Sequence, residues 1–347
     1  MGRSKSPATT DPLRARASRR PRVVRRGRGT PAAARLASWA LALAASLLLA
    51  GRVDAEEGGS GHYVPGATAS FIDMMPGKPS IVYLNAFLYY SGSAAARRDI
   101  PIAGDLVAEL DGTSYADSSI LLAEMKVNSL PIDYAIALVI PYVWMDVSGE
   151  VTGPLTRKRR DHADGLGDIT FSPLMIGWTH EALKLEGYLN IYAPTGAYEV
   201  GRLANPGKNF WTFEPGVAAN WISPTIGLEL TGFLAYDVNN RNPATNYQSG
   251  NQLHFDGTVA EHIPLFDLGI FGLGANVFVY QQVTGDSGSG ATLGSFEGSS
   301  VGIGPTVSYI NTIGGVDIVS EAKWLPELDV TNRLQGDFVW FKIGAVF

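Results

Sequence analysis

The sequence predicts an all-β fold, a transmembrane antiparallel up-and-down β-barrel of about 12 strands. Three observations support this prediction. The chain ends on a segment in which every second residue from Val339 to Phe347 is apolar. The N-terminal segment is rich in arginine and is followed by a short apolar run. In the rest of the chain, segments with alternating apolar and polar residues are joined by connections that are alternately long and short. In a closed barrel one side of each strand meets lipid and the other meets a polar lumen, which produces a period of two.

Residues 1–55 are expected to be a signal peptide. Arginines crowd residues 3–35, and the apolar run 36–50 that follows is shorter than the roughly 20 residues that a membrane-spanning helix needs. Residues 53–55 offer a small-residue cleavage site. The pair Arg19 and Arg20 also fits twin-arginine export, but a barrel must be delivered unfolded, which favours the Sec route.

The charge of the chain argues against nucleic acid as a partner. Residues 1–55 carry 12 of the 27 Lys and Arg residues and 2 of the 33 Asp and Glu residues. The remainder therefore has 15 basic and 31 acidic residues, a formal charge of −16. Nucleic-acid binding depends on Lys and Arg that neutralise phosphates.

The absence of Cys excludes disulfides, thiolate nucleophiles and cysteine metal sites. Beyond the signal segment no apolar stretch reaches 18 residues, which argues against a helical membrane protein. A large soluble β-sandwich or β-propeller remains the alternative fold, and the pattern of connections decides against it.

Twelve strands are predicted in chain order, at 81–91, 114–128, 133–148, 166–179, 182–195, 210–223, 226–238, 250–263, 267–283, 296–311, 314–325 and 335–347. Their connections alternate between long ones, at 92–113, 149–165, 196–209, 239–249, 284–295 and 326–334, and short ones. Long extracellular loops and short periplasmic turns produce this rhythm in outer-membrane barrels, whereas a sandwich has no reason to alternate. The domain 81–347 is therefore expected to be the barrel, with both termini periplasmic.

Side-chain parity predicts which residues face the lumen. In the segment 182–195 the residues Leu185, Leu189 and Ile191 share one face and charged or aromatic residues share the other. The same division in the other strands predicts a solute pathway lined by Glu186, Tyr188, Asn190, Tyr192, Glu214, Glu229, Asp237, Asp256, Asn276, Tyr280, Asp317, Glu321 and Lys323. Aromatic residues near the strand ends, including Trp144, Trp211 and Trp221, are expected to form interfacial girdles.

Four short motifs resemble an outer-membrane family, the meta-pathway phenol-degradation proteins, which includes the SphA-like proteins. The motifs lie at 61–66 (GHYVPG), 165–168 (GLGD), 192–196 (YAPTG) and 209–215 (NFWTFEP). The resemblance covers essentially all of residues 56–347, and the order of the motifs carries it. It implies a membrane barrel, encoded near aromatic or lipid catabolism, that passes hydrophobic solutes, and it supplies no catalytic residues.

The predicted function is passive uptake of small hydrophobic or aromatic compounds through the cell outer membrane of a Gram-negative bacterium. About twelve strands imply a lumen narrower than that of the 16–18-stranded porins. Acidic and aromatic linings suit a neutral or cationic, partly apolar solute. Two alternatives remain: the charges form a salt-bridged plug with Lys184, Lys323 and Lys342, or the barrel has a structural or adhesive role.

Three further sites follow from the residues outside the strands. Residues 56–80 are too irregular for a strand, and they form either a hatch folded into the lumen or a disordered periplasmic leader. Arg157, Lys158, Arg159 and Arg160 lie in an expected external loop, where they contact lipopolysaccharide phosphates or form a solvated loop tip. The last strand, ending at Phe347, is the expected recognition site for the outer-membrane assembly machinery, and the barrel's surface is expected to contact membrane lipids.

An enzyme, in particular an outer-membrane lipid hydrolase, is the other function class. The histidines are His62, His162, His180, His254 and His262, and none lies in a recognisable nucleophile motif. They form no metal-binding sequence motif such as H-E-x-x-H. The expectation is therefore no catalytic residue, no metal and no cofactor.

Overall fold

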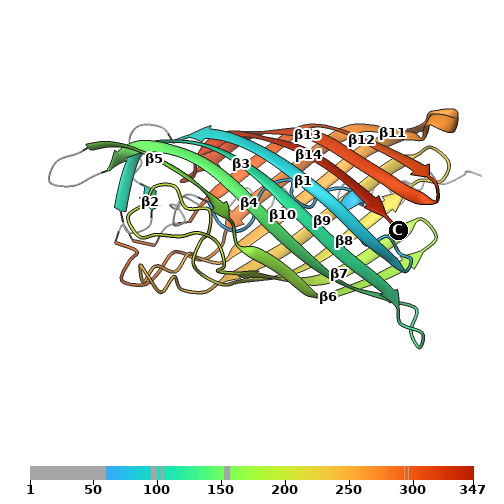
Figure 1. Cartoon of the computed structure of the whole chain (residues 1–347), viewed down its shortest axis with the longest axis horizontal. Coiled ribbons are helices and arrows are strands. Elements are labelled where there is room, and N and C mark those ends of the chain that lie inside the picture. Colours follow the sequence, from blue (N-terminus) through green and yellow to red (C-terminus); the bar gives the residue numbers. More distant parts are fainter. Residues whose placement is uncertain (1–59, 95–99, 103–104, 152–156, 293, 296) are drawn as a thin grey trace, which may run out of the picture. The chain divides into compact units, whose positions relative to one another are not determined.

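The computed structural model describes residues 60–94, 100–102, 105–151, 157–292, 294–295 and 297–347. The expected signal peptide, residues 1–55, lies outside these residues. The described chain is a closed antiparallel barrel of twelve strands, so the predicted fold is confirmed (Figure 1). The sheet contains fourteen strand segments, because one barrel strand is divided into β5 and β6 and the short β2 pairs only with β3. The segments are β1 Ser80–Ser93, β2 Ile100–Ile102, β3 Asp105–Lys126, β4 Asp133–Val151, β5 Arg157–Leu166, β6 Ile169–His180, β7 Leu183–Ala193, β8 Thr212–Ile222, β9 Leu228–Asn239, β10 Gln252–Pro264, β11 Ile270–Gln282, β12 Ser299–Ile313, β13 Val316–Thr331 and β14 Gln335–Val346.

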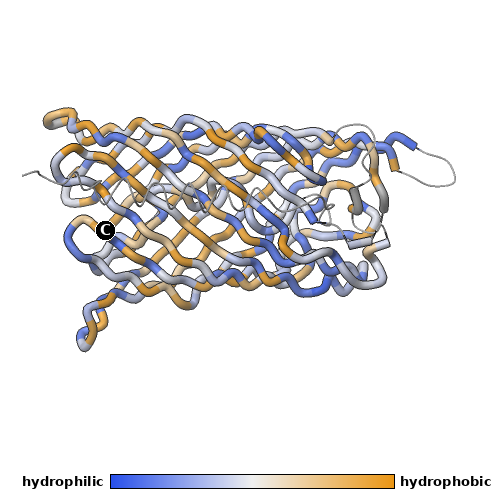
Figure 2. Tube along the Cα trace, turned by 180° about the vertical axis from the view of Figure 1, so that it is seen from behind, coloured by the Kyte–Doolittle hydropathy of each residue, from blue (hydrophilic) through white to orange (hydrophobic). Residues whose placement is uncertain are grey.

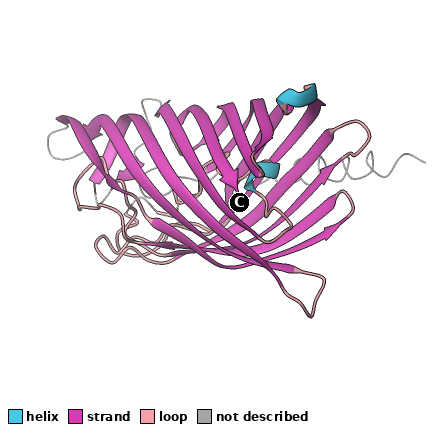
Figure 3. Cartoon of the chain, turned by 45° about the vertical axis from the view of Figure 1, so that its right-hand side comes forward, coloured by secondary structure: helices cyan, strands magenta, loops and turns pink. Residues whose placement is uncertain are grey.

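The barrel closes where the first and last strands meet. β1 pairs with β14 from Val82 opposite Val346 to Ser93 opposite Gln335, and Phe347 exchanges backbone hydrogen bonds with Ile81. β14 also pairs with β13, and β3 pairs with both β1 and β4, so the sheet has no open edge along its main body. Figure 3 shows the tilted strands wrapping around the axis. Closure satisfies the backbone polar groups that lipid cannot hydrogen-bond.

β5 and β6 together make one barrel strand. Both pair with β4, β5 with its second half and β6 with its first, and the break falls at Gly167 and Asp168. The predicted strand 166–179 thus corresponds to β6, with its start displaced by three residues. The break lets the Asp168 side chain accept hydrogen bonds from the loop that follows β7, as described below.

The predicted long loops are shorter than expected because strands continue past the apolar band. β3 begins at Asp105 and pairs with β2, so the expected loop 92–113 is largely a hairpin. Likewise β4 and β5 extend into the expected loop 149–165, and β13 extends to Thr331 in the expected loop 326–334. These extensions contain many polar residues, so their sequence resembles that of loops, although their backbone groups pair in the sheet.

The ends of the barrel differ in their connections. At one end, called the turn end, the connections are 127–132, 181–182, 223–227, 265–269 and 314–315. At the other, called the loop end, residues 194–211, 240–251, 283–292, 294–295 and 297–298 belong to longer connections. A small apolar cluster supports the loop end, where Leu203 and Ala204 pack against Leu110, Val147 and Ala163.

Apolar and polar residues alternate along the strands, as Figure 2 shows by hydropathy. In β8 the outward Phe213 and Val217 are exposed, whereas the inward Thr212, Glu214 and Asn220 are buried. Exposed apolar side chains of this kind cover the outer wall of the other strands as well. Among the described residues, no helix is long and apolar enough to cross a membrane. The outward face therefore has the composition required for contact with acyl chains.

We expect the substitution Val217→Arg to lower the free energy of unfolding by about 2–4 kcal/mol, because Val217 lies mid-strand on the lipid face. Denaturant unfolding of the barrel in lipid vesicles measures this change. Ile226→Arg is the matched control, because Ile226 is as exposed (59% against 57%) but lies in the turn 223–227. Its cost near the interface is about 0–1 kcal/mol. Equal effects of the two substitutions would contradict the placement of Val217 deeper in the membrane than Ile226.

Candidate functional site in the barrel lumen

Residues 60–79, here called the lumen segment, run through the interior of the barrel. Its one regular element is the short 3-10 helix η2, Phe71–Asp73, which is seen inside the strands in Figure 3. The segment contacts inward side chains of strands all around the barrel, from β3 and β7 through β10 to β14. Only residues 60–80 of the expected hatch 56–80 are described.

The first part of the lumen segment is held by Asp256 of β10. The Tyr63 hydroxyl donates to one carboxylate oxygen at 2.7 Å, and the Gly66 backbone N–H donates to the other at 2.7 Å. From β14 the Trp340 indole donates to the Pro65 carbonyl at 2.8 Å. Gly66 has a positive φ of 79°, and an added Cβ would lie 2.5 Å from Leu325, so glycine is required at this close approach.

The remaining part of the segment supplies backbone donors to three more wall carboxylates. The N–H of Phe71 donates to Glu229 at 2.9 Å, that of Met75 to Glu186 at 3.0 Å, and that of Gly77 to Glu124 at 3.1 Å. A buried carboxylate is costly without such donors. The segment therefore satisfies the acidic wall in place of water.

A compact charge cluster anchors η2. Lys342 of β14 contacts Asp73 at 2.5 Å and Glu321 at 3.7 Å, and Lys323 contacts Glu321 at 2.9 Å. The two lysines and two carboxylates balance in charge, and all four side chains are buried. Lys342 also donates to the Ala67 carbonyl at 2.7 Å. Two of the three lysines considered for a salt-bridged plug thus form ion pairs, and the third, Lys184, donates to the Pro76 carbonyl at 2.8 Å.

His62 connects the lumen segment to the loop end. Its ring lies between Asp168 at 2.9 Å and Thr212 at 2.7 Å, and it stacks on Tyr192 with centroids 4.8 Å apart. Asp168 also accepts from the backbone N–H groups of Gly196 and Lys208, in the loop 194–211. One carboxylate therefore holds both the segment and the loop.

The lumen also contains an apolar surface, and two methionines of the lumen segment cover it. Met74 and Met75 are buried and pack in one cluster with inward residues of the wall. These wall residues are Ala135, Ala137, Met175, Tyr188, Ala218, Phe233 and Ala235. A second cluster, around Phe278, Leu325, Phe338 and Trp340, receives Val64 and Ala67.

The thirteen residues predicted to line the lumen all occupy the inward parity of their strands in the structure. Asn190 and Tyr192 donate to Glu214 at 2.7 Å each, and Asn276 donates to the Gly257 carbonyl at 2.8 Å. Asp317 lies at the turn end, where it is partly exposed and pairs with Lys78 of the lumen segment at 3.0 Å. Sequence reasoning missed Glu124, Asp168 and Asp73, although the inward parity of Glu124 could have identified it.

Arg157, Lys158, Arg159 and Arg160 do not lie in a loop, because all four belong to β5 and pair with β4. The expected loop position is therefore wrong. Arg160 forms an ion pair with Asp146 at 2.6 Å, and Lys158 lies 3.5 Å from Glu150. Arg159 donates to the Gly201 carbonyl at 2.9 Å. The four side chains remain exposed at the loop end.

The nucleophile pattern G-x-S-x-G occurs once in the sequence, at 298–302. Ser300 lies within β12, and its hydroxyl donates to Glu327 at 2.6 Å. A nucleophile elbow requires a sharp turn from a strand into a helix. The geometry at Ser300 is that of a wall hydrogen bond.

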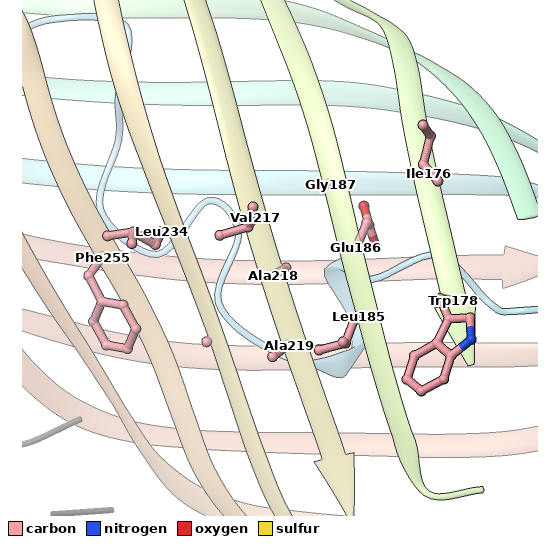
Figure 4. A pocket seen from close by; sticks show the side chains of 11 residues that line it. Ile176, Trp178, Leu185, Glu186, Gly187, Val217, Ala218, Ala219, Leu234 and Phe255 are labelled. Atoms are coloured by element: carbon pink, nitrogen blue, oxygen red, sulfur yellow. The ribbon is translucent and has the colours of Figure 1, made fainter. Parts of the chain in front are cut away.

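The outer wall carries an apolar groove of about 570 Å³ across β6 to β10 (Figure 4). Trp178, Leu185, Val217 and Phe255 line it, and Gly187 and Gly232 leave room between them. Glu186 lies at the same place on the inward side and holds Met75. Few outward side chains therefore cover the barrel wall at the place where the methionines pack against its inner face.

The closed barrel, its apolar outer face and its filled lumen define an outer-membrane β-barrel protein. A family model described as "Putative MetA-pathway of phenol degradation" matches residues 92–343, and the chain belongs to this family. The resemblance expected from the sequence motifs is confirmed.

Solved structures of outer-membrane proteins match the chain. The chain is similar to an outer membrane channel from Pseudomonas putida F1, at 14% identity and a TM-score of 0.61, over 82% of this chain and 100% of that one. It also matches the β domain of the Bordetella autotransporter BrkA (12% identity, 78% and 99% covered, TM-score 0.43). A further match is the transport unit of the autotransporter AIDA-I from Escherichia coli, at 12% identity and a TM-score of 0.44, over 80% of this chain and 94% of that one. At 14% identity the likeness to the channel from Pseudomonas putida F1 concerns the fold alone. No protein with a curated description matches the chain.

We expect Asp73→Asn to lower the free energy of unfolding by about 3–5 kcal/mol, because it leaves two buried lysines facing one carboxylate. Denaturant unfolding in detergent measures the change. Lys78→Ala is the control, since it removes an ion pair whose lysine is 60% exposed, and it should change stability by less than about 1 kcal/mol. A small effect of Asp73→Asn would show that the cluster does not anchor the segment.

Proposed function

We propose that this protein is an outer-membrane channel for passive uptake of small hydrophobic or aromatic compounds, with the lumen segment as its gate. The family to which the chain belongs is described by phenol degradation, and a structurally similar barrel is described as an outer membrane channel. Both support transport as the class of function. The concentration gradient drives the flux, and the solute is not chemically altered.

The observation that carries this proposal is the apolar surface beneath Met74 and Met75. An aqueous porin has a polar interior, whereas here methionines cover alanine, methionine and aromatic side chains inside the barrel. Methionine is flexible and polarisable, so its contacts can be replaced by those of another apolar group. A small aromatic solute could occupy the same surface when the methionines move.

The acidic groups around this surface provide selectivity against anions. Glu186 is close to Met75, and Glu214, Asp237 and Asp256 lie further along the wall. Buried carboxylates repel a carboxylate or phosphate solute and do not bind a neutral one. A neutral aromatic or aliphatic compound fits this combination best.

An enzymatic function is not part of the proposal. Ser300 contacts Glu327, and His262 contacts Glu229 at 2.7 Å, so neither is arranged as a nucleophile with its base. A structural or adhesive barrel is the remaining alternative, and the flux measurement below distinguishes it.

We also propose two partners from the surface of the barrel. The exposed side chains of Arg157 and Lys158 at the loop end could contact lipopolysaccharide phosphates, with Arg160 partly neutralised by Asp146. The strand β14, followed by Phe347, is the proposed recognition element for the outer-membrane assembly machinery.

We expect liposomes that contain the folded protein to take up phenol-like aromatics faster than sugars of similar size. Deletion of residues 60–79 should raise the flux of both solute classes, because it opens the lumen. Replacement of Met74 and Met75 by Ser should reduce the preference for aromatics and leave the barrel closed to sugars. Solute influx and single-channel conductance measure these effects.

Met125→Ser is the matched control, since it makes the same methionine-to-serine change at an exposed position of β3, outside the lumen. If neither solute class enters even after the deletion, the channel proposal fails and a structural role is favoured. If flux is unchanged by the deletion while the intact protein conducts, the segment is not the gate.

A further inference from the structure

Three neighbouring strands bring two carboxylates and one imidazole together inside the barrel. Glu214 of β8, Asp237 of β9 and His254 of β10 are all buried, and one ligand atom of each lies within 4.8 Å of the others. His254 Nε2 is 3.4 Å from Asp237 Oδ1 and 3.6 Å from Glu214 Oε2. The same ring nitrogen therefore faces both carboxylates.

The two carboxylates of this group need positive charge beside them. Among the described residues, neither Glu214 nor Asp237 forms an ion pair with a lysine or arginine, and His254 is their shared partner. A buried carboxylate requires a cation or several hydrogen-bond donors. Either a protonated imidazole or a metal ion between the three groups supplies the charge.

The spacing fits a metal ion. Zinc lies about 2.0–2.2 Å from imidazole nitrogen and carboxylate oxygen, so two ligand atoms at a tetrahedral centre are about 3.3 Å apart. The measured separations from His254 Nε2 are 3.4 and 3.6 Å. Only small side-chain movements are needed to place an ion among the three atoms.

A second observation points to the same ion. Asp237 Oδ2 is buried and has no hydrogen-bond partner, although Asp237 is fully enclosed. The other carboxylate is well supported from outside the group, since Asn190 and Tyr192 each donate to Glu214 at 2.7 Å. Outer partners of this kind orient metal ligands. Asp237 thus keeps one oxygen that no protein donor uses, and a metal ion bound by this carboxylate would balance its charge.

We propose that Glu214, Asp237 and His254 bind one divalent transition-metal ion of the zinc class. Imidazole with two carboxylates suits zinc and its neighbours in the first transition row better than calcium, which prefers oxygen ligands alone. The ion joins β8, β9 and β10. It also fixes His254, whose ring stacks on Tyr63 of the lumen segment with centroids 3.9 Å apart. The site therefore secures the wall where the segment first attaches.

The pair Glu229 and His262 is a natural control within the same barrel. It is buried and its atoms are 2.7 Å apart, and no other His, Asp or Glu among the described residues groups with it as a third ligand. Glu229 instead accepts from Thr231 and from the Phe71 N–H. The hydrogen bonds of this pair are those of a structural contact, and its two side chains offer fewer ligands than a metal site needs.

The test is metal binding to the full-length mature protein, folded in detergent and stripped with a chelator. Zn²⁺ titration by calorimetry should give one ion per chain, and Co²⁺ should produce the visible absorbance of a four- or five-coordinate site. Asp237→Asn and His254→Gln should abolish binding, and Tyr192→Phe should weaken it by about 10–100-fold. Glu229→Gln, the matched control, should bind as the wild type does. A difference in electrophoretic mobility between heated and unheated samples of each variant shows that its barrel is folded.

If the folded wild-type protein binds neither Zn²⁺ nor Co²⁺, the proposal is overturned. The charge that balances the two carboxylates is then assigned to a protonated His254. Equal loss in Glu229→Gln and Asp237→Asn would also overturn it, because binding would then not depend on this group. The measurement requires no solute flux, so its outcome is independent of the proposed channel function.

Discussion

The burial of acidic side chains inside a closed barrel is the constraint on which the rest of the structure depends. A barrel in lipid must present apolar residues outward, so its charges are confined to the inner face. Once the lumen is filled, these carboxylates lose water and require other donors. The lumen segment supplies them as backbone N–H groups at Phe71, Met75 and Gly77, and Lys342 and Lys323 supply the charge that Asp73 and Glu321 need. The segment and the wall are therefore complementary.

Much of the barrel could be predicted from the sequence because its physical signal is local. The inward parity of Glu214 and Glu186 follows from alternation within one strand, and both are buried as expected. The extensions of β3 and β5 were missed because polar strands beyond the membrane have the composition of loops. The grouping of Glu214, Asp237 and His254 was missed as well. It depends on the register between three strands, which no single strand's pattern contains.

The lumen combines two surfaces that are usually separate. Its carboxylates are satisfied by the segment's backbone, and its apolar patch is covered by Met74 and Met75. These interactions differ in how they respond to displacement. Hydrogen bonds to buried carboxylates can be released only if water or another donor replaces them, whereas methionine contacts can be exchanged for those of an apolar solute. Local movement of the methionines therefore requires less free energy than release of the entire segment.

This difference determines how a gate of this kind can open. The strongest anchors, at Asp256 and at the cluster around Lys342, lie on the part of the segment before Met74. The part after it, near Gly77 and Lys78, is held by weaker contacts, one of them an exposed ion pair. Opening at the turn end would uncover the apolar patch while the first half stays attached. His62 would keep its contact with Asp168, so the loop end could remain in place as the turn end moves.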